Sequence, residues 1–543
     1  MKYPQLLLMM VVMVVAVPLL LIIPSLSELL WTLDLKQVIS KLINYPGFFT
    51  MLSQSILTAL VSVSVVTGLT LISARYLLAL KQSGQQTNQH KTQHSWLGIL
   101  SMPHLAFAVA LLWLAAPTGW LWRLIPVETP WMPWFDRQYL VSLWIILIAK
   151  ELPFMWFMTL RALQQLPLER WLLIGRSQGH SETRTWWLIV IPALVQRLRL
   201  PLCVVAVYSL TVVDLALFAA PQTPAPLAVQ VVQWQLQFNP LSQQLAVVGS
   251  VMLALLAVLV CGWVRLQEWV LFTWAQRLLS RAVTKSELIL LKISRVGRVL
   301  PSAFMGLAIL LLLALVALAH GRGWFYPALL PQQWDFTLWH SEWLFLAMGA
   351  WRAFWIAVVV ASISLALCIV TAEWQRARQQ KIPMALLLLP LFIPQVFLVL
   401  VWIPWTDTNL FWVAWAHVPF SYAYALLAYL PAEERFEQRY LQQSQTFGYS
   451  FWRAWWAVKR PLLKVPLLTA FALAMLVSIA QYVPTLLIGG GRVSTLTTDF
   501  VALSSGSNSS MQALYALTMW LLCALVLVVL KPRATAAREG EIQ

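Results

Sequence analysis

Four polar residues lie inside otherwise apolar segments of the chain, where an ionisable side chain is costly and usually serves a purpose. Lys150 and Glu151 are adjacent, Asp214 has no basic neighbour in the sequence, and Gln481 carries an uncharged amide. Neighbouring positions of a helix point about 100° apart, so Lys150 and Glu151 are not expected to pair directly. They either brace different helices or line a pathway for a solute, and both interpretations stay open.

Asp214 is the strongest candidate for a pathway residue, because its apolar run directly follows the first of two repeated loops described below. Other polar residues in apolar runs more often hydrogen-bond between membrane helices than contact a solute. The weaker candidates of this kind are His104, Gln395, His417 and Gln481.

The sequence contains no set of residues that predicts catalysis or cofactor binding. It has no G-x-x-x-x-G-K-[ST] motif to hold the phosphates of ATP, and the three glycines at 489–491 are typical of a turn. His90 and His94 have helical spacing, but no Cys, Asp or Glu stands nearby to complete a metal site. The four cysteines lie in apolar runs and are expected to be packing residues. We therefore predict neither enzymatic activity nor a bound metal or cofactor.

Two short polar stretches repeat each other without a gap at an offset of 269 residues. The first reads LIGRSQGHSETRTWWLIVIP (173–192) and the second reads QQSQTFGYSFWRAWWAVKRP (442–461). The matching pairs are Gly179 and Gly448, Ser181 and Ser450, Arg184 and Arg453, Trp186 and Trp455, Trp187 and Trp456, and Pro192 and Pro461. One half of the chain is therefore a diverged copy of the other.

In each stretch a glycine interrupts a helical pattern, as expected where two short helices meet at a bend. Gly179 and Gly448 would adopt backbone angles that other residues avoid. Pro192 and Pro461 follow 13 residues later in each copy and would end the second helix or open the next span. Such a bent pair projects from its surroundings, so we predict that the Gly, Ser, Arg and Pro positions of both loops dock a partner. A passive connector between spans is the alternative.

The elements that position these residues are twelve apolar runs of membrane-spanning length, six in each half. About 20 helical residues cross a hydrocarbon layer of ~30 Å, and 60% of the residues are apolar whereas 10% are charged. The runs cover 5–24, 52–73, 96–116, 138–158, 200–220, 244–264, 299–319, 353–372, 383–403, 411–430, 465–488 and 512–530. They predict an all-α polytopic membrane protein built as two tandem six-helix repeats. The first run has no small-residue cleavage site after it and is expected to be retained.

The repeats divide the chain into two predicted domains joined by a basic linker. The predicted ranges are 1–270 for the first repeat (core about 51–265, loop 170–192), 271–298 for the linker, and 299–543 for the second repeat (core about 350–530, loop 439–461). The linker would lie along an anionic membrane surface or act as a solvated connector.

A net charge of +17 could suggest nucleic acid, but its distribution favours a topological role. With Met1 inside, 29 of the 37 Lys and Arg fall in cytoplasmic segments and 7 outside. The positive-inside rule then places both termini in the cytoplasm, and no nucleic-acid partner is expected. A Trp- and Pro-rich outer segment, 118–138, would form an interfacial belt or a docking surface for an outer partner.

The repeated loops resemble the EAA loop of binding-protein-dependent ABC importer permeases, whose pattern is E-A-A, three residues, Gly, and a downstream I-x-L-P. Gly179, Gly448, Pro192 and Pro461 stand where that family has its Gly and Pro, whereas 173–175 and 442–444 depart from E-A-A. The resemblance covers both halves, with LLIGGGRVSTLTT (486–498) after the eleventh run. A chain with two such halves is similar to the fused permeases of the thiamine and ferric-iron branch and to the YnjC-type permeases.

This resemblance implies the type I ABC importer permease fold, duplicated in one chain, in a bacterial inner membrane. It also implies that two copies of a cytoplasmic ATPase bind the two loops, that a periplasmic binding protein delivers the substrate, and that transport proceeds by alternating access. A secondary active transporter with a six-plus-six repeat and a passive membrane scaffold remain as alternatives. No feature of the sequence identifies the substrate.

Overall fold

Long helices form almost the whole molecule, as the apolar runs predict. The structure is a computed structural model that describes residues 20–24, 34–82, 102–124, 138–279, 286–506 and 508–530. Within these ranges, nine helices are long and apolar enough to cross a membrane, and a bent pair, Phe451–Leu462 with Lys464–Ala480, makes up to ten. The all-α polytopic class is therefore confirmed.

The number of twelve long spans is not reproduced in the described part of the chain. The predicted run 383–403 is divided among three short helices, α18 (Met384–Leu387), α19 (Leu389–Phe392) and α20 (Gln395–Trp402). Pro383, Pro390 and Pro394 stand at the starts of these helices, because proline lacks the N–H that a continuous helix needs. The first predicted run, 5–24, lies almost wholly outside the described residues, as do His90 and His94.

The first repeat is a bundle preceded by the amphipathic helix α4 (Leu35–Ile43). Its helices are α5 (Phe48–Gln82), α7 (His104–Ala115), α8 (Trp120–Leu124), α9 (Val141–Leu163), α10 (Leu168–Ser177), α11 (Glu182–Thr185), a π-helical segment (Trp186–Val190), α12 (Ile191–Thr211), α13 (Asp214–Ala219), α14 (Leu227–Leu236) and α15 (Pro240–Leu279). The helix α16 (Ser286–His320) follows and packs against α5 and α28.

The second repeat reproduces this order of elements. Its helices are α17 (Thr337–Arg378), α18 to α20, a 3₁₀ turn (Ile403–Trp405), α21 (Leu410–Glu434), α22 (Arg439–Thr446), α23 (Phe451–Ala454), a π-helical segment (Trp455–Lys459), α24 (Arg460–Leu462), α25 (Lys464–Ala480), α26 (Val483–Gly489), α27 (Leu496–Ala502), a 3₁₀ turn (Leu503–Ser505) and α28 (Ser509–Leu530).

Equivalent elements start at residues separated by the same 269 positions found in the sequence. The pairs of first residues are Glu182 and Phe451, Trp186 and Trp455, Ile191 and Arg460, Asp214 and Val483, Leu227 and Leu496, and Pro240 and Ser509. Both copies of the Trp-Trp motif form a π-helical segment, and both following helices break at the same place, after Thr211 and after Ala480. The duplication therefore extends from the loops through the end of each repeat.

Two sequence-based spans end earlier than predicted because of these breaks. The run 200–220 is interrupted at Val212, whose extended backbone ends α12, so Asp214 begins the separate helix α13. The run 465–488 is interrupted in the same way at Gln481, where α25 ends. Asp214 and Gln481 therefore lie at helix breaks and not inside continuous spans.

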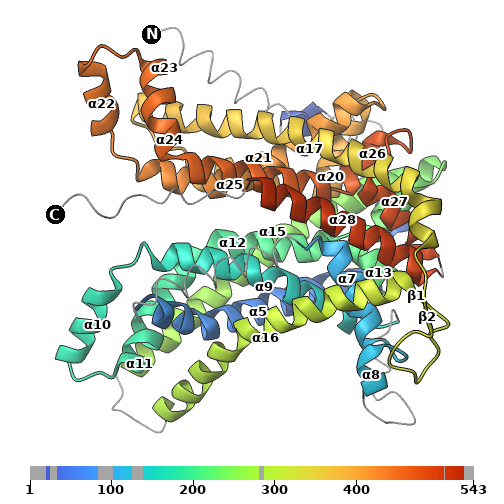
Figure 1. Ribbon diagram of the computed structural model, residues 1–543, viewed down its shortest axis with the longest axis horizontal. Helices are drawn as coiled ribbons and strands as arrows, with labels where there is room; N and C mark the ends of the chain where they lie inside the picture. Colours follow the sequence, from blue (N-terminus) through green and yellow to red (C-terminus); the bar gives the residue numbers. More distant parts are fainter. Residues whose placement is uncertain are drawn as a thin grey trace.

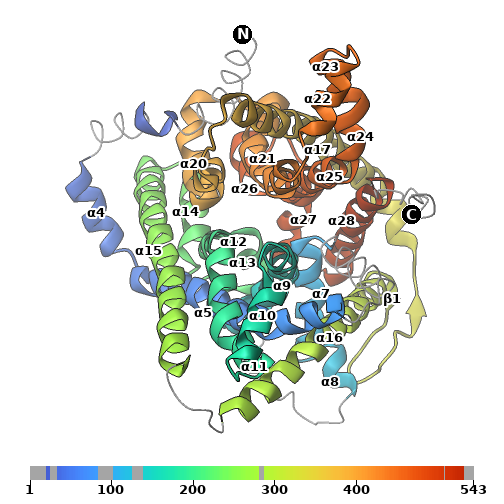
Figure 2. The same ribbon diagram turned by 90° about the vertical axis from the view of Figure 1, so that its left-hand side faces the viewer.

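The loops lie at the opposite end of the molecule from α8 and the two short strands. Figure 1 shows α10–α11 and α22–α23 projecting from the left-hand end, named here the loop end, whereas α8 and the two short strands lie toward the other, the hairpin end. Strands β1 (Gly321–Arg322) and β2 (Gln333–Trp334) pair antiparallel. Viewed from the loop end, both pairs of short helices face the reader (Figure 2).

Part of the Trp-rich outer segment closes against this hairpin. Trp120 donates through Nε1 to the carbonyl of Leu329 at 2.8 Å, and Arg123 donates to the carbonyl of Ala328 at 2.6 Å. The rings of Trp113 and Trp324 are 4.7 Å apart. These contacts tie the first repeat to the connection that leads into the second.

The predicted linker 271–298 forms no separate helix in the described residues. Residues 271–279 continue α15 and residues 286–298 begin α16, while 280–285 lie outside the described part. Gly297 allows α16 to cross α5 closely, because a Cβ at this position would lie 2.1 Å from the carbonyl oxygen of Ile72.

Candidate functional site

The glycine of each loop makes the predicted bend. Gly179 follows α10 with φ of +78°, and Gly448 follows α22 with φ of +82°. In each copy the serine two residues later caps the next short helix: the Ser181 hydroxyl accepts from the N–H of Arg184 at 3.2 Å, and Ser450 accepts from the N–H of Arg453 at 3.4 Å. The same local chemistry therefore builds two short helices around a left-handed glycine in both halves.

The prolines of the motif open the following helices. Pro192 lies in the first turn of α12, and Pro461 lies in the first turn of α24. In the first repeat the chain from Glu182 to Thr211 continues as one long helix, whereas the second repeat bends by 80° at Leu463. The prolines were predicted either to end the second short helix or to open the next one. Both prolines open the next helix.

The arginines of the two loops have different surroundings. Arg184 is buried, and its guanidinium donates to the carbonyl of Leu278 at 3.1 Å near the end of α15. Arg453 is exposed and lies over the ring of Tyr449, 4.7 Å from its centroid. The first arginine therefore holds its loop to the bundle, whereas the second leaves its charge at the surface.

A hydrogen bond from an arginine of α5 to a threonine of the first loop joins this loop to the bundle. Arg75 of α5 donates to the hydroxyl of Thr183 at 2.6 Å. On the exposed side of the same loop, Arg176 and Glu182 form an ion pair. Thr183 is buried, so the α5 contact lies beneath the projecting surface.

The second loop is joined to its bundle by a buried cluster of charges, which the sequence reasoning missed. Lys459 is fully buried at the end of the π-helical segment and donates to Glu433 of α21 at 2.8 Å and also to Glu373 of α17. Trp455 donates through Nε1 to Glu373 at 2.9 Å. Arg376 donates to the backbone carbonyl of Glu433 at 3.2 Å and forms an ion pair with its side chain. The charges are far apart in the sequence, so only the fold reveals that they compensate each other.

Both loops expose apolar side chains at their tips, where a partner would make contact. Leu173 and Ile174 are exposed on α10, and Tyr440 and Phe447 are exposed on or beside α22. Near the start of α22, a hydrogen bond with Tyr440 and the charge of Glu437 raise the pKa of Arg439, and its guanidinium forms an ion pair with Glu437. An apolar tip with charged edges is the composition expected of a protein-binding surface.

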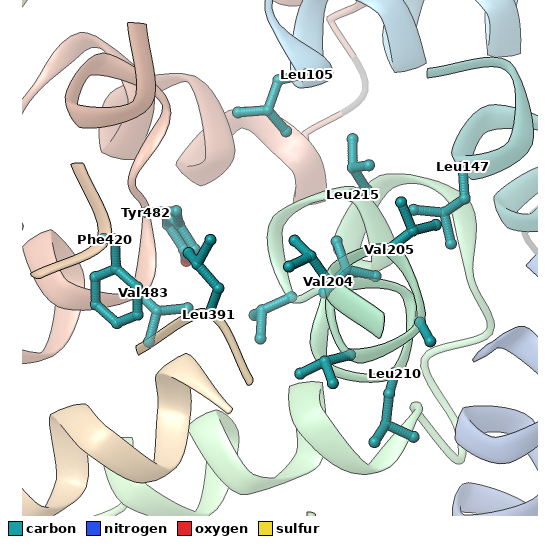
Figure 3. Packing of buried hydrophobic residues seen from close by; sticks show 14 of the residues in the cluster. Leu105, Leu147, Val204, Val205, Leu210, Leu215, Leu391, Phe420, Tyr482 and Val483 are labelled. Carbon is teal, nitrogen blue, oxygen red and sulfur yellow. The ribbon is translucent and has the colours of Figure 1, made fainter. Parts of the chain in front are cut away.

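A cavity of about 270 Å³ lies between the two repeats. It brings together all four predicted pathway residues, Lys150, Glu151, Asp214 and Gln481, and also two of the weaker candidates, His104 and Gln395. Figure 3 shows part of its apolar lining: Leu391, Phe420, Tyr482 and Val483 of the second repeat gather on one side, and Val204 of the first repeat faces them.

Hydrogen bonds connect the amides at the cavity to the second repeat. Gln395 donates to the side-chain oxygen of Gln481 at 3.4 Å, and Gln481 donates to the carbonyl of His417 at 3.1 Å. The His417 ring contacts the hydroxyls of Ser478 and Thr485 at 3.0 and 2.9 Å and does not line the cavity. His417 therefore makes hydrogen bonds between helices, as expected of the polar residues that were the weaker candidates for the pathway.

Lys150 and Glu151 are both buried at the cavity wall on α9. The Lys150 ammonium donates to the backbone carbonyl of Met102, and no direct hydrogen bond joins it to Glu151 among the described residues. This agrees with the expectation that the two adjacent side chains point apart.

Three tyrosines at the cavity were not identified from the sequence. Tyr208 comes from α12, Tyr424 from α21 and Tyr482 from the break before α26, so they share no spacing or motif. The only hint was that Tyr482 neighbours Gln481. The structure therefore supplies an aromatic set that sequence spacing could not indicate.

The glycine run and the cysteines are the remaining local features. The glycine run forms a turn after α26, with φ of +52° at Gly490 and +76° at Gly491. The four cysteines are free. No group of three or more His, Cys, Asp or Glu residues suited to a metal ion occurs among the residues that the structure describes.

Two comparisons with known proteins gave a match. The family described as "Binding-protein-dependent transport system inner membrane component" matches residues 364–531, within the second repeat. The chain is 31% identical over 480 residues to the "Inner membrane ABC transporter permease protein YnjC" of Escherichia coli (strain K12), an alignment that covers 87% of this chain and 86% of that protein. No solved structure matches.

Proposed function

The chain belongs to the family of ABC transporter permeases, inner-membrane components of binding-protein-dependent transport, and from this premise we propose that it forms the translocation pathway of an importer. Membership of this family selects an ABC permease over the secondary transporter and the passive scaffold. Energy for transport comes in this family from ATPase partners.

The projecting loops carry the proposal. Two copies of the same Gly-centred helical pair lie at one end of a single chain, each with exposed apolar residues at its tip. A twofold arrangement of identical ATPase subunits suits two similar docking surfaces, so we propose that one copy binds each loop. The side chains of this interface would include Ser181, Arg184, Ser450 and Arg453, the first three as supports of the loop and Arg453 as a direct contact.

The proposed pathway passes through the cavity between the repeats, with Lys150, Glu151, Asp214 and Gln481 at its wall. Both repeats contribute to the wall, so a change in their relative position would change access to the cavity. Movement of the loops by the ATPase would open it alternately toward the loop end and the hairpin end, which is alternating access.

The orientation in the membrane follows from the same assignment. With the loop end in the cytoplasm, both termini are cytoplasmic and the hairpin end faces the periplasm, where a substrate-binding protein would deliver the solute. The distribution of Lys and Arg supports this orientation.

Substitution of the two loop glycines tests the proposal. Nothing lies within 4 Å of a Cβ built at Gly179 or Gly448, so a larger residue meets no steric clash and only the positive φ opposes it. Val resists such angles, whereas Asn tolerates them. We expect Gly179→Val and Gly448→Val each to reduce co-purification of the ATPase and transport of the substrate. The double change should abolish co-purification and transport. The matched Asn variants should retain most of the partner.

Transport, ATPase co-purification and ATP hydrolysis would be measured at equal abundance in the membrane. The purified chain alone should not hydrolyse ATP, because the phosphate-binding motif is absent. The proposal fails if the double Val variant binds its ATPase and transports like the unmodified chain.

A further inference from the structure

The cavity between the repeats is lined by two carboxylic acids and one lysine. The acids are Glu151 and Asp214, the lysine is Lys150, and the ring of His104 also lines the cavity. The Lys150 ammonium is already engaged by the carbonyl of Met102. No ion pair involves Glu151 or Asp214 in the part of the chain that the structure describes, and the positive group within electrostatic range of Glu151 is Lys150.

Glu151 is the observation that distinguishes this cavity from an ordinary acidic cluster. Its side chain is buried, with 8% of the residue exposed, and it lines the cavity without a hydrogen-bond partner among the described residues. A buried carboxylate without a partner is unfavourable, and a ligand that supplies a positive charge removes that cost.

The three tyrosines, which come from both repeats, line the same cavity as the carboxylates. Tyr208 lies within electrostatic range of both Glu151 and Asp214. From the second repeat, Tyr424 lies within range of Glu151 and Tyr482 within range of Asp214. Each carboxylate of the first repeat therefore has a tyrosine of the second repeat within electrostatic range. Aromatic faces attract cations as well as apolar groups.

Apolar and aromatic residues form most of the rest of the wall, together with Thr211, Thr469 and the amides of Gln395 and Gln481. The apolar and aromatic residues include Phe154, Phe157, Phe420, Leu391 and Val204. A small inorganic cation would need several oxygen ligands at close range, whereas this wall provides hydrocarbon surface around two carboxylates. The lining is therefore better suited to an organic cation than to a metal ion.

We propose that the cavity is a binding site for a cationic organic solute, with Glu151 and Asp214 as its charge partners and Tyr208, Tyr424 and Tyr482 as its aromatic contacts. The inference rests on the proposed function, because it names the class of substrate that the pathway accepts. Both repeats supply residues of the site. Movement of one repeat against the other would therefore lower the affinity for the solute.

Three small aromatic probes of similar size separate charge from shape. Benzyltrimethylammonium is cationic, benzyl alcohol is neutral and phenylacetate is anionic. Their binding to the purified full chain in lipid nanodiscs would be measured with radiolabelled benzyltrimethylammonium and unlabelled competitors. We expect the cation to bind and the other two to compete poorly. This comparison uses the unmodified chain and does not depend on the folding of any variant.

Two isosteric variants then test the assigned residues. Glu151→Gln and Asp214→Asn remove one charge each and should weaken binding of benzyltrimethylammonium by about tenfold or more. Asp499→Asn is the matched control, because Asp499 is a part-buried carboxylate that does not line the cavity. The control should bind the cation as the unmodified chain does.

Absence of cation binding by the folded chain, preference for phenylacetate, or unchanged binding in both cavity variants would each overturn the inference. These outcomes are separable from failure of the proposed function. If the ATPase still docks on both loops while the cation does not bind, only the substrate class is wrong. If the loop variants leave ATPase docking intact, the permease mechanism is wrong whatever the cavity binds.

Discussion

At the scale of single residues, the two repeats hold their loops by different chemistry. Lys459 of the second loop is buried between Glu373 and Glu433, whereas the equivalent residue of the first loop is the apolar Val190. A charge without its partner is costly in such surroundings, so these three groups and Arg376, which also pairs with Glu433, depend on each other. The cluster links the loop to both α17 and α21 and gives the second loop a polar anchor.

Lys459→Met should therefore destabilise the protein strongly. Removing the ammonium leaves the part-buried Glu373 without its ion-pair partner and leaves Glu433 with Arg376 alone, and breaking a buried pair costs about 3–5 kcal/mol. The additional change Glu373→Gln should recover part of the loss, because it removes the carboxylate that has lost its partner. Thermal unfolding of the detergent-purified protein measures both effects.

Lys381→Met is the matched control for this prediction. Lys381 pairs with Glu434, next to Glu433 in the sequence, but its side chain is 82% exposed. Exposed pairs contribute at most about 1 kcal/mol, so the unfolding temperature should hardly change. Equal effects of the two lysine substitutions would show that the buried cluster does not anchor the loop.

At the scale of elements, the bent helical pairs could be predicted from the sequence, whereas the helix breaks could not. A glycine within a helical pattern indicates a bend through its own backbone freedom, and both glycines have the expected positive φ. The breaks at Val212 and Gln481 occur between apolar or uncharged residues, where hydropathy continues without interruption. Tertiary packing decides their position. The cavity residues at these breaks were therefore named as candidates, but their grouping required the fold.

A complementary pair of small and large residues holds the two helices of each loop together. In the first loop a Cβ at Gly175 would lie 2.1 Å from Oγ1 and 3.0 Å from Cβ of Thr185. At the equivalent positions the second loop has the buried residues Ser444 and Ala454. The larger residue has changed sides between the copies, which keeps the helices close in both.

Gly175→Ser alone should disturb the first loop, because overpacking typically costs about 1–3 kcal/mol. Thr185→Ala in the same chain should restore the loop, since the double variant has the residue pair of the second loop. Hydrogen exchange of residues 168–185 and co-purification of the ATPase would measure the disturbance and the rescue. The reciprocal pair, Ala454→Thr followed by Ser444→Gly, should behave in the same way. Additive effects with no rescue in either loop would contradict the pairing.

At the scale of the whole molecule, the two repeats exchange equivalent contacts. The last helix of the first repeat, α15, packs against α20, and the last helix of the second repeat, α28, packs against α7, the equivalent of α20. This reciprocity is expected of two copies related by an approximate twofold axis. The sequence predicted the duplication, since the offset is constant, but it could not show that the copies face each other across a cavity, because those contacts join residues far apart in the chain.

The arrangement of the ends predicts the orientation of the protein in the cell. The loops lie at one end, and the hairpin of β1 and β2 lies at the other (Figure 1). Positive residues concentrate in the segments assigned to the cytoplasm, so we expect the loop end inside. Single cysteines at Phe447, which is 83% exposed, and at Leu330, which is 62% exposed, would mark the two ends in a background without the four native cysteines.

A membrane-impermeant maleimide should label Leu330→Cys in spheroplasts and Phe447→Cys only in inside-out vesicles. Leu173→Cys, at the exposed tip of the first loop, should follow Phe447→Cys, because the duplicated loops lie at the same end. Labelling of one loop from each side would mean that the repeats are inverted relative to each other in the membrane. Two ATPase copies on one face could then not reach both loops, so this result would contradict the twofold docking on which the transport mechanism depends.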